Sequence, residues 1–126
     1  MRIAIGVGCK QGCASEAIIA VVRRALSSAQ RSDAVALFTH QDKQGEAGLI
    51  EAARRLALPL VFLDRAALRE AAPRAVTYSA KVMAMFGLPS IAETAALAGA
   101  GPGSILLVPR ISDAGASCAI AGTNER

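Results

Sequence analysis

Short apolar runs alternate with amphipathic stretches along the first half of the chain. Residues 2–7, 33–39 and 60–63 are apolar and are bounded by glycine, proline or polar residues, which predicts three buried strands. Between them, residues 14–29 and 45–58 carry apolar side chains at helical spacing, and Pro59 ends the second of these helices. Strands that alternate with helices in this way pair in parallel.

Helix-capping residues divide the next part of the chain. Asp64 is expected to cap a short helix that runs to residue 72, and Ser79 to cap a second that ends before Gly87. Ser90 and Glu93 have the spacing of a capping box, which predicts a helix over residues 91–100. Three side chains of the helix after Ser79 are expected to point inward: Val82, Met85 and Phe86.

The last part of the chain has the pattern of a β-hairpin. Residues 104–109 and 116–121 are strand-like, and the polar residues 112–115 between them supply turn chemistry. The predicted fold class is therefore α/β: a three-layer α/β/α arrangement with a mixed sheet of about five strands that ends in a β-hairpin. No linker or repeat interrupts the pattern, so residues 1–126 are expected to form a single domain.

Composition and charge exclude several classes of protein. An apolar content of 53%, a charged content of 19% and a mean hydropathy of +0.41 exclude a disordered chain. The apolar runs are too short to span a membrane. The net charge is +4, but the arginines are scattered and aromatic residues make up only 3%, so no nucleic-acid partner is expected. A small polyanionic ligand is compatible with this charge.

The cysteines indicate a reducing compartment. There are three, an odd number, and residues 1–2 lead directly into a strand-like run with no leader pattern. We therefore expect free thiols and a cytoplasmic location. Cys9 and Cys13 lack a second Cys or His pair to complete a metal site, and His40 is the only histidine. No metal and no cofactor are expected.

A glycine-rich loop after the first strand is the first candidate site. Gly6, Gly8 and Gly12 lie between a strand and a helix, where backbone N–H groups can face an anion. A tight turn explains the glycines equally well, but it does not explain Lys10 and Gln11 at the tip of the loop. Cys9 and Cys13 lie near the same helix start, where a thiolate would be stabilised, although packing of a small side chain is the simpler interpretation.

Two further polar groups are candidates. Lys43 and Glu46 follow the second strand, where open α/β sheets bind ligands, and their spacing would let them pair. Ser79, Lys81 and Glu93 form the third group. On spacing alone, two helix caps and a solvated lysine account for that group as well.

Together, these stretches resemble the CobE family, which is also the C-terminal domain of CbiG in cobalamin biosynthesis. The resemblance lies in GVGCKQGCASEAI, FTHQDKQGEAGLIEAARRLALPLVFL, YSAKVMAMFGLPSIAETAAL, ILLVPR and CAIA, and it spans residues 3–121. Cys13 and residues 39–41 depart from the family pattern, which leaves the roles of Cys13 and His40 open.

The resemblance implies a set of site residues. The glycine-loop positions of the family fall on Gly6, Gly8, Cys9 and Gly12. Its later motifs fall on Lys43, Glu46, Ser79, Lys81 and Glu93. The implied ligand is a precorrin-type tetrapyrrole, whose carboxylates need cations such as Lys10, Lys43 and Lys81. Its ring face needs apolar contacts, for which Met83, Met85 and Phe86 are candidates.

Three functions remain open. The first is a protein of the aerobic cobalamin pathway that binds a precorrin-type intermediate. The second is a hydrolase that opens a precorrin ring lactone, as CbiG does, with Glu46 or Glu93 as the general base. The third is a docking module for another enzyme of the cobalamin pathway.

Overall fold

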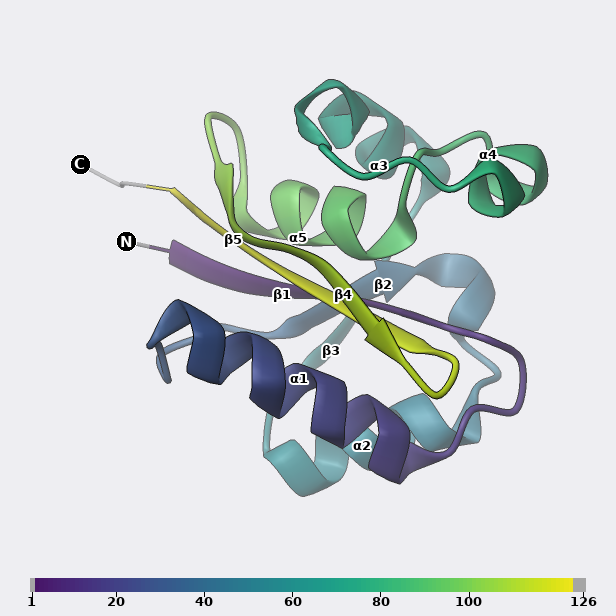
Figure 1. The fold of residues 1–126 in the computed structure, drawn as a ribbon, viewed down its shortest axis with the longest axis vertical. Coiled ribbons are helices and arrows are strands. Elements are labelled where there is room, and N and C mark those ends of the chain that lie inside the picture. Colours follow the sequence, from purple (N-terminus) through teal and green to yellow (C-terminus); the bar gives the residue numbers. More distant parts are fainter. Residues whose placement is uncertain (1, 124–126) are drawn as a thin grey trace.

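An open five-stranded sheet lies between two layers of helices in the computed structural model, which describes residues 2–123 (Figure 1). The chain alternates strand and helix up to β3, continues through a run of short helices, and ends in two strands. The elements in chain order are β1 (Arg2–Cys9), α1 (Ser15–Ala29), β2 (Leu37–His40), the 3-10 turn Gln41–Lys43, α2 (Ala47–Leu56), β3 (Leu60–Leu63), α3 (Arg65–Ala71), the 3-10 turn Ala72–Arg74, α4 (Ala80–Phe86), α5 (Ile91–Ala100), β4 (Ile105–Asp113) and β5 (Ala116–Thr123).

The sheet is mixed. Its strand order is β3-β2-β1-β5-β4, in which β1, β2 and β3 pair in parallel while β5 runs antiparallel to both β1 and β4. Parallel pairing follows from the helices that cross between the first three strands. The predicted three-layer α/β fold with a C-terminal hairpin is confirmed.

The two faces of the sheet pack differently. Ile3, Ile5 and Val7 of β1 point toward α1 and α2, where larger aliphatic side chains fill the core. The opposite face carries Ala4 and Gly6 beneath α5, whose residues are almost all buried. Figure 1 shows α1 and α2 on one side of the sheet and α3, α4 and α5 on the other. Small residues on the second face let α5 lie close to the sheet.

The hairpin is longer than the sequence pattern predicted. β4 continues through Pro109 to Asp113, and the turn is made by Ala114 and Gly115 with φ values of 54° and 85°. Two successive positive φ angles are typical of a two-residue hairpin turn whose twist matches the strands. Pro109 is tolerated because β4 is an edge strand, and the pairing register shifts between Val108 and Ile111. The turn thus lies within the predicted segment 112–115, but the predicted end of the strand at Pro109 was wrong, because Ser112 and Asp113 still belong to β4.

Helix caps are confirmed at three positions, with one correction. The side chains of Asp64, Ser79 and Ser90 each accept a hydrogen bond from the first turn of the helix that follows. The reciprocal half of the predicted capping box is absent, because the Glu93 carboxylate accepts hydrogen bonds from other segments of the chain.

α4 packs less closely than predicted. None of its residues is buried, and Met85 is 60% exposed, so the expectation that Met85 points inward was wrong. Figure 1 shows α4 at the edge of the layer that contains α5, between the irregular segments 75–79 and 87–90. Only Val82 and Phe86 pack, as partly buried side chains, against the core beneath.

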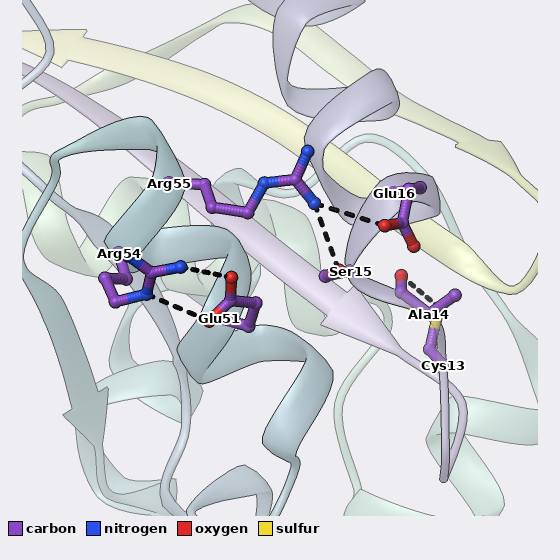
Figure 2. A network of polar contacts seen from close by, with 7 residues as sticks. All are labelled: Cys13, Ala14, Ser15, Glu16, Glu51, Arg54 and Arg55. Carbon is purple, nitrogen blue, oxygen red and sulfur yellow. Dashed lines mark hydrogen bonds and ion pairs between the residues drawn. The ribbon is translucent and has the colours of Figure 1, made fainter.

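Polar contacts join α2 to the start of α1. Arg55 donates hydrogen bonds to Ser15 Oγ and Glu16 Oε2, at 3.5 and 3.2 Å (Figure 2). Beside this contact, a Cβ at Gly48 would lie 2.1 Å from the carbonyl oxygen of Cys13, so glycine is required there. The loop between β1 and α1 thus rests on the first turn of α2.

Among residues 2–123, no single helix is long and apolar enough to cross a membrane; α4 and α5 reach that length and composition only when the bent pair is counted together.

Candidate functional site

A cleft of about 920 Å³ opens at the end of the sheet where β1 and β2 finish. It is lined by residues from four segments: 8–11, 42–46, 79–91 and 110–117. The size is at the upper end of the range usual for small-molecule sites. The carboxyl ends of strands are also where open α/β sheets bind ligands.

Most of the predicted site residues meet in this cleft. Segments far apart in sequence converge because β1 and β2 are neighbours and the β4–β5 hairpin pairs alongside β1. The predicted residues that line the cleft are Gly8, Cys9, Lys10, Lys43, Glu46, Ser79 and Lys81. Gly6, Gly12 and Glu93 are outside the lining.

Charged side chains of both signs line the cleft, with one more cation than carboxylates. All three lysines of the chain, Lys10, Lys43 and Lys81, line the cleft together with Arg110. None of the four forms an ion pair within 4.0 Å in the part of the chain that the structure describes. Three carboxylates share the lining, those of Asp42, Glu46 and Asp113. The cleft therefore presents a small excess of unpaired positive charge.

Apolar side chains cover one side of the cleft. Val82, Met85 and Phe86 come from α4, and Ile91 begins α5. Met83, which the resemblance offered as a ring contact, is not among the lining residues. A cleft with cations on some walls and aliphatic and aromatic groups on another suits a flat apolar ligand with acidic substituents.

Gly8 is the glycine that borders the cleft directly. It pairs with Ser117 across β1 and β5, and Ser117 Oγ donates to its carbonyl oxygen at 3.3 Å. A Cβ at Gly8 would lie 2.8 Å from Ser117 Oγ and 3.5 Å from Ile91 Cβ. The missing side chain keeps open the space between the hairpin and the start of α5.

Gly6 has a packing role. A Cβ there would lie 1.9 Å from the carbonyl oxygen of Ala92 and 2.5 Å from the backbone nitrogen of Ala96. These are backbone atoms of α5, which cannot move aside without lifting the helix from the sheet. The glycine therefore sets the distance between α5 and β1.

Gly12 joins the loop to Glu46. Its φ of +74° suits glycine, and its N–H donates to Glu46 Oε1 at 2.8 Å. Glu46 is the N-cap residue of α2 and is half-buried. The predicted Lys43–Glu46 ion pair is absent from the described contacts, because this carboxylate turns toward the glycine loop instead.

The loop itself offers fewer free N–H groups than its glycine pattern predicted. Gly8 and Cys9 belong to β1 and are paired with β5. The N–H of Lys10 donates to the Gly115 carbonyl at 2.8 Å, and that of Cys13 to the Lys10 carbonyl at 3.2 Å. Side-chain cations consequently supply more of the positive potential than the loop backbone does.

The thiol of Cys9 is neutral in the free protein. Burial raises its pKa to about 11, while the nearby Lys43 opposes the shift. A stabilised thiolate, the more reactive of the two alternatives drawn from the sequence, does not fit this environment. Cys13 and Cys118 are buried, and all three thiols are free. No group of three or more His, Cys, Asp or Glu side chains lies close enough to hold a metal ion within residues 2–123.

Glu93 lies behind the cleft and is fully buried. Oε1 accepts from the backbone N–H groups of Val76 and Thr77, and Oε2 accepts from Thr77 Oγ1 and the Arg110 N–H, all within 2.9 Å. Burial alone would raise the pKa of Glu93, but these hydrogen bonds together outweigh it and lower the pKa below its usual value. An ionised carboxylate with every oxygen engaged supports neighbouring segments and is poorly placed to take up a proton as a base.

Several lining residues were missed by the sequence reasoning. Arg110, Asp113 and Ser117 come from the hairpin, which had been interpreted only as part of the fold. The available signal was topological: a hairpin paired antiparallel to β1 must bring its turn to the end of β1 where the glycine loop begins.

Fold and site together define an open α/β protein with a candidate cleft at the carboxyl edge of its sheet, lined by charged and apolar side chains. The model of the family described as cobalamin synthesis G C-terminus matches residues 3–121, and the chain belongs to this family. It is a cobalamin biosynthesis protein of the CobE and CbiG C-terminal type.

Named relatives agree with this assignment. The chain is 34% identical to Protein CobE from Sinorhizobium sp over 122 residues, which cover 95% of this chain and 79% of the relative. Its fold is similar to the crystal structure of CobE, a protein from the cobalamin (vitamin B12) biosynthetic pathway, with a TM-score of 0.90 and 37% identity over 99% of this chain and 93% of the other. It is also similar to the cobalamin biosynthesis protein chiG from Agrobacterium tumefaciens str. C58, with a TM-score of 0.77 and 35% identity over 98% and 99% of the two chains.

Proposed function

We propose that this protein binds a precorrin-type tetrapyrrole intermediate of cobalamin biosynthesis in the cleft. The observation that carries the proposal is the grouping of Lys10, Lys43, Lys81 and Arg110, without ion-pair partners among the described residues, around an apolar wall. A tetrapyrrole of this pathway has the complementary chemistry, because it is a large ring that bears many carboxylates. The proposal includes a cytoplasmic location, which the odd number of cysteines favours.

The geometry supports a carrier more readily than a catalyst. Cleft cations can hold carboxylates by charge-assisted hydrogen bonds, and α4 can contribute apolar contacts to the ring. In contrast, the two carboxylates considered as general bases are both engaged: Glu46 with Gly12, and Glu93 with four donors.

A lactone hydrolase is the second candidate, because Glu46 lines the cleft and has one oxygen free of any described hydrogen bond. Through that oxygen it could still take a proton from an attacking water. A third candidate, docking to another enzyme of the pathway, draws on the exposed apolar side chains of Val76, Tyr78 and Met85 next to the cleft. A hydrolase would bind the ligand and then change it, whereas a docking module would need no ligand of its own.

Co-elution with a pathway tetrapyrrole separates these functions. The purified protein is incubated with a precorrin preparation made enzymatically, passed through a gel-filtration column, and the pigment that elutes with it is analysed by mass spectrometry. A carrier returns the pigment with unchanged mass, whereas a lactone hydrolase returns it with the mass of an opened ring. If no pigment elutes with the protein, the proposal is wrong.

Glu46→Gln sharpens the comparison. The substitution keeps the size of the side chain and an oxygen that can accept from the Gly12 N–H, and it removes the base. For a carrier we expect the affinity to stay within about two- to threefold, since the amide oxygen can still accept from the Gly12 N–H. A protein that binds normally and loses all conversion of the pigment would favour the hydrolase instead.

A further inference from the structure

His40 is a polar residue that the proposed site does not yet use. It is the last residue of β2, immediately before the segment that carries Asp42 and Lys43 into the cleft. Its side chain is only 2% exposed, and its ring lies 5.2 Å from the ring of Phe86 between centroids, with the two planes tilted by 50°. Phe86 in turn lines the cleft. One aromatic ring therefore stands between His40 and the ligand space.

The hydrogen bond at one ring nitrogen assigns the proton to the other. Nδ1 accepts from the backbone N–H of Asp42 at 3.0 Å, so a neutral imidazole carries its proton on Nε2. Burial lowers the pKa of His40, which outweighs the opposing influence of Asp42, and the nearby Arg65 and Lys43 act in the same direction as burial. The ring is thus a neutral donor at neutral pH.

That donor has no acceptor. Nε2 is buried and makes no hydrogen bond to any residue in the described part of the chain. Buried N–H groups in folded proteins are almost always paired, and an unpaired one lowers stability. The Nε2–H of His40 is therefore free to donate to an acceptor on a bound ligand.

The Phe86 ring, which covers His40, belongs to a helix that is weakly packed. Phe86 ends α4, a helix with no buried residue, and the next residue is Gly87 with a φ of +70°. α4 has few buried apolar contacts, which is typical of segments that open locally at low cost. α4 contributes no strand to the sheet, so the proposal requires displacement of this helix alone.

We propose that His40 is a ligand-binding residue of the cleft, whose Nε2–H donates to a carboxylate of the bound tetrapyrrole once Phe86 moves aside. This inference rests on the proposed function and adds a contact to it. A carboxylate is the fitting acceptor because it carries no proton of its own, and because Lys43, three residues further on, attracts acidic substituents to the same wall.

Two substitutions separate the donor from the structural role of the ring. In His40→Asn, the side-chain oxygen can take the place of Nδ1 and accept from the Asp42 N–H, but no donor remains at the position of Nε2. In His40→Gln, the longer amide can present an N–H near the position of Nε2, but the acceptor for Asp42 is lost. The two variants therefore remove one function each.

Binding and unfolding are measured on both variants with uroporphyrin III, a stable tetrapyrrole polycarboxylate, as the probe. We expect His40→Asn to lose some stability, because its smaller side chain gives up the ring contact with Phe86. It should bind the probe roughly ten- to a hundredfold more weakly, as the loss of a hydrogen bond to a charged group requires. His40→Gln is expected to keep most of its affinity and to lose stability.

The other outcomes would contradict either the role of His40 alone or the proposed function as well. If the native protein binds uroporphyrin III and His40→Asn binds it equally well, the role of His40 is wrong while the proposed function stands. If both variants lose affinity in parallel with stability, the ring has only a structural role and the inference is again overturned. If the native protein binds no uroporphyrin III, both the proposed function and this inference are wrong.

A chemical probe tests the cover independently of any ligand. Because the chain has one histidine, the ultraviolet absorbance of the N-carbethoxyimidazole that diethyl pyrocarbonate forms reports on His40, whatever lysines the reagent also modifies. We expect slow modification of the native protein and at least tenfold faster modification of Phe86→Ala. Equal rates would show that Phe86 does not control access to His40, and would overturn that part of the proposal.

Discussion

Glu93 has the sequence position of a capping-box residue, but its carboxylate has a different role in the fold. Its distance from Ser90 is that of a capping box, and the Ser90 half of the box is present. The carboxylate itself reaches away from the helix start and holds two other segments: the loop at Val76 and Thr77, and β4 at Arg110. One buried charge thereby joins the α4 loop and the hairpin, which are two walls of the cleft.

Glu93→Gln is expected to destabilise the fold by about 2–4 kcal/mol, measured by urea unfolding. The amide removes the charge that strengthens four hydrogen bonds. It also turns an NH₂ group toward two donors, of which the Thr77 hydroxyl can rotate but a backbone N–H cannot. Glu70→Gln, at an exposed position of α3, is the matched control and should change the free energy of unfolding by less than about 0.5 kcal/mol.

Acid should abolish the difference between native protein and Glu93→Gln. The pKa of Glu93 is lower in the folded state than in the unfolded chain, so the unfolded chain binds more protons between the two values. The stabilisation is therefore complete above about pH 4.5 and is lost as the pH falls through the folded-state pKa. A difference that stays constant down to the lowest pH at which the protein folds would contradict the ionised state of Glu93.

At the scale of elements, the contact between β1 and α5 determines where the cleft begins. Gly6 and Gly8 lie on the same face of β1, two residues apart, and α5 crosses both of them. Their surroundings differ, since a Cβ at Gly6 would overlap helix backbone, whereas the tightest neighbour of a Cβ at Gly8 is the rotatable hydroxyl of Ser117. The same substitution should consequently have different effects at the two positions.

Gly6→Ala should destabilise the protein by about 3 kcal/mol or more, because the new methyl group would overlap the backbone of α5. Gly8→Ala should cost about 1 kcal/mol or less, since Ser117 can rotate away, and Gly8→Val should reduce tetrapyrrole binding while the protein stays folded. Urea unfolding and a binding titration measure the two effects. Equal losses of stability at both positions would contradict the close approach of α5 at Gly6.

At the end of α2, a substitution is expected to stabilise the protein instead of destabilising it. Ala57 closes the helix with a φ of 57°, a left-handed conformation that strains any residue with a Cβ. Ala57→Gly should therefore stabilise the protein by about 0.5–1 kcal/mol. Ala20→Gly, at an exposed position inside α1, should destabilise it by about 1 kcal/mol. If thermal unfolding shows the same sign for both variants, α2 does not end as described.

At the scale of the whole molecule, the order of elements could be predicted from the sequence. Short apolar runs separated by amphipathic stretches are strong signals, and capping residues such as Asp64 and Ser79 are local ones. The turn was predicted within residues 112–115, but the length of β4 was underestimated, because Pro109 suggested the end of a strand.

Part of the candidate site could be predicted from the sequence, namely the residues whose position follows from strand topology. Lys43 and Glu46 follow a parallel strand, so their position at the carboxyl edge follows from topology. The contribution of Arg110 depends on how far the hairpin extends, and the neutral state of Cys9 depends on burial that no local pattern encodes. The exposure of Met85 likewise depends on tertiary packing, because nothing in the structure covers that side of α4.

The central claim is that the cleft holds the carboxylates of a tetrapyrrole, and a salt-dependent binding titration of Lys43→Ala tests it most directly. With uroporphyrin III as the probe, we expect Lys43→Ala to bind about 1–3 kcal/mol more weakly than the native protein at low salt, since a charge-assisted hydrogen bond is lost. The difference should shrink as the salt concentration rises, because charges at the rim of a cleft are screened. Arg24→Ala, which removes an exposed cation of α1 outside the cleft lining, should bind like the native protein. Equal affinities for Lys43→Ala and the native protein at every salt concentration would contradict the account.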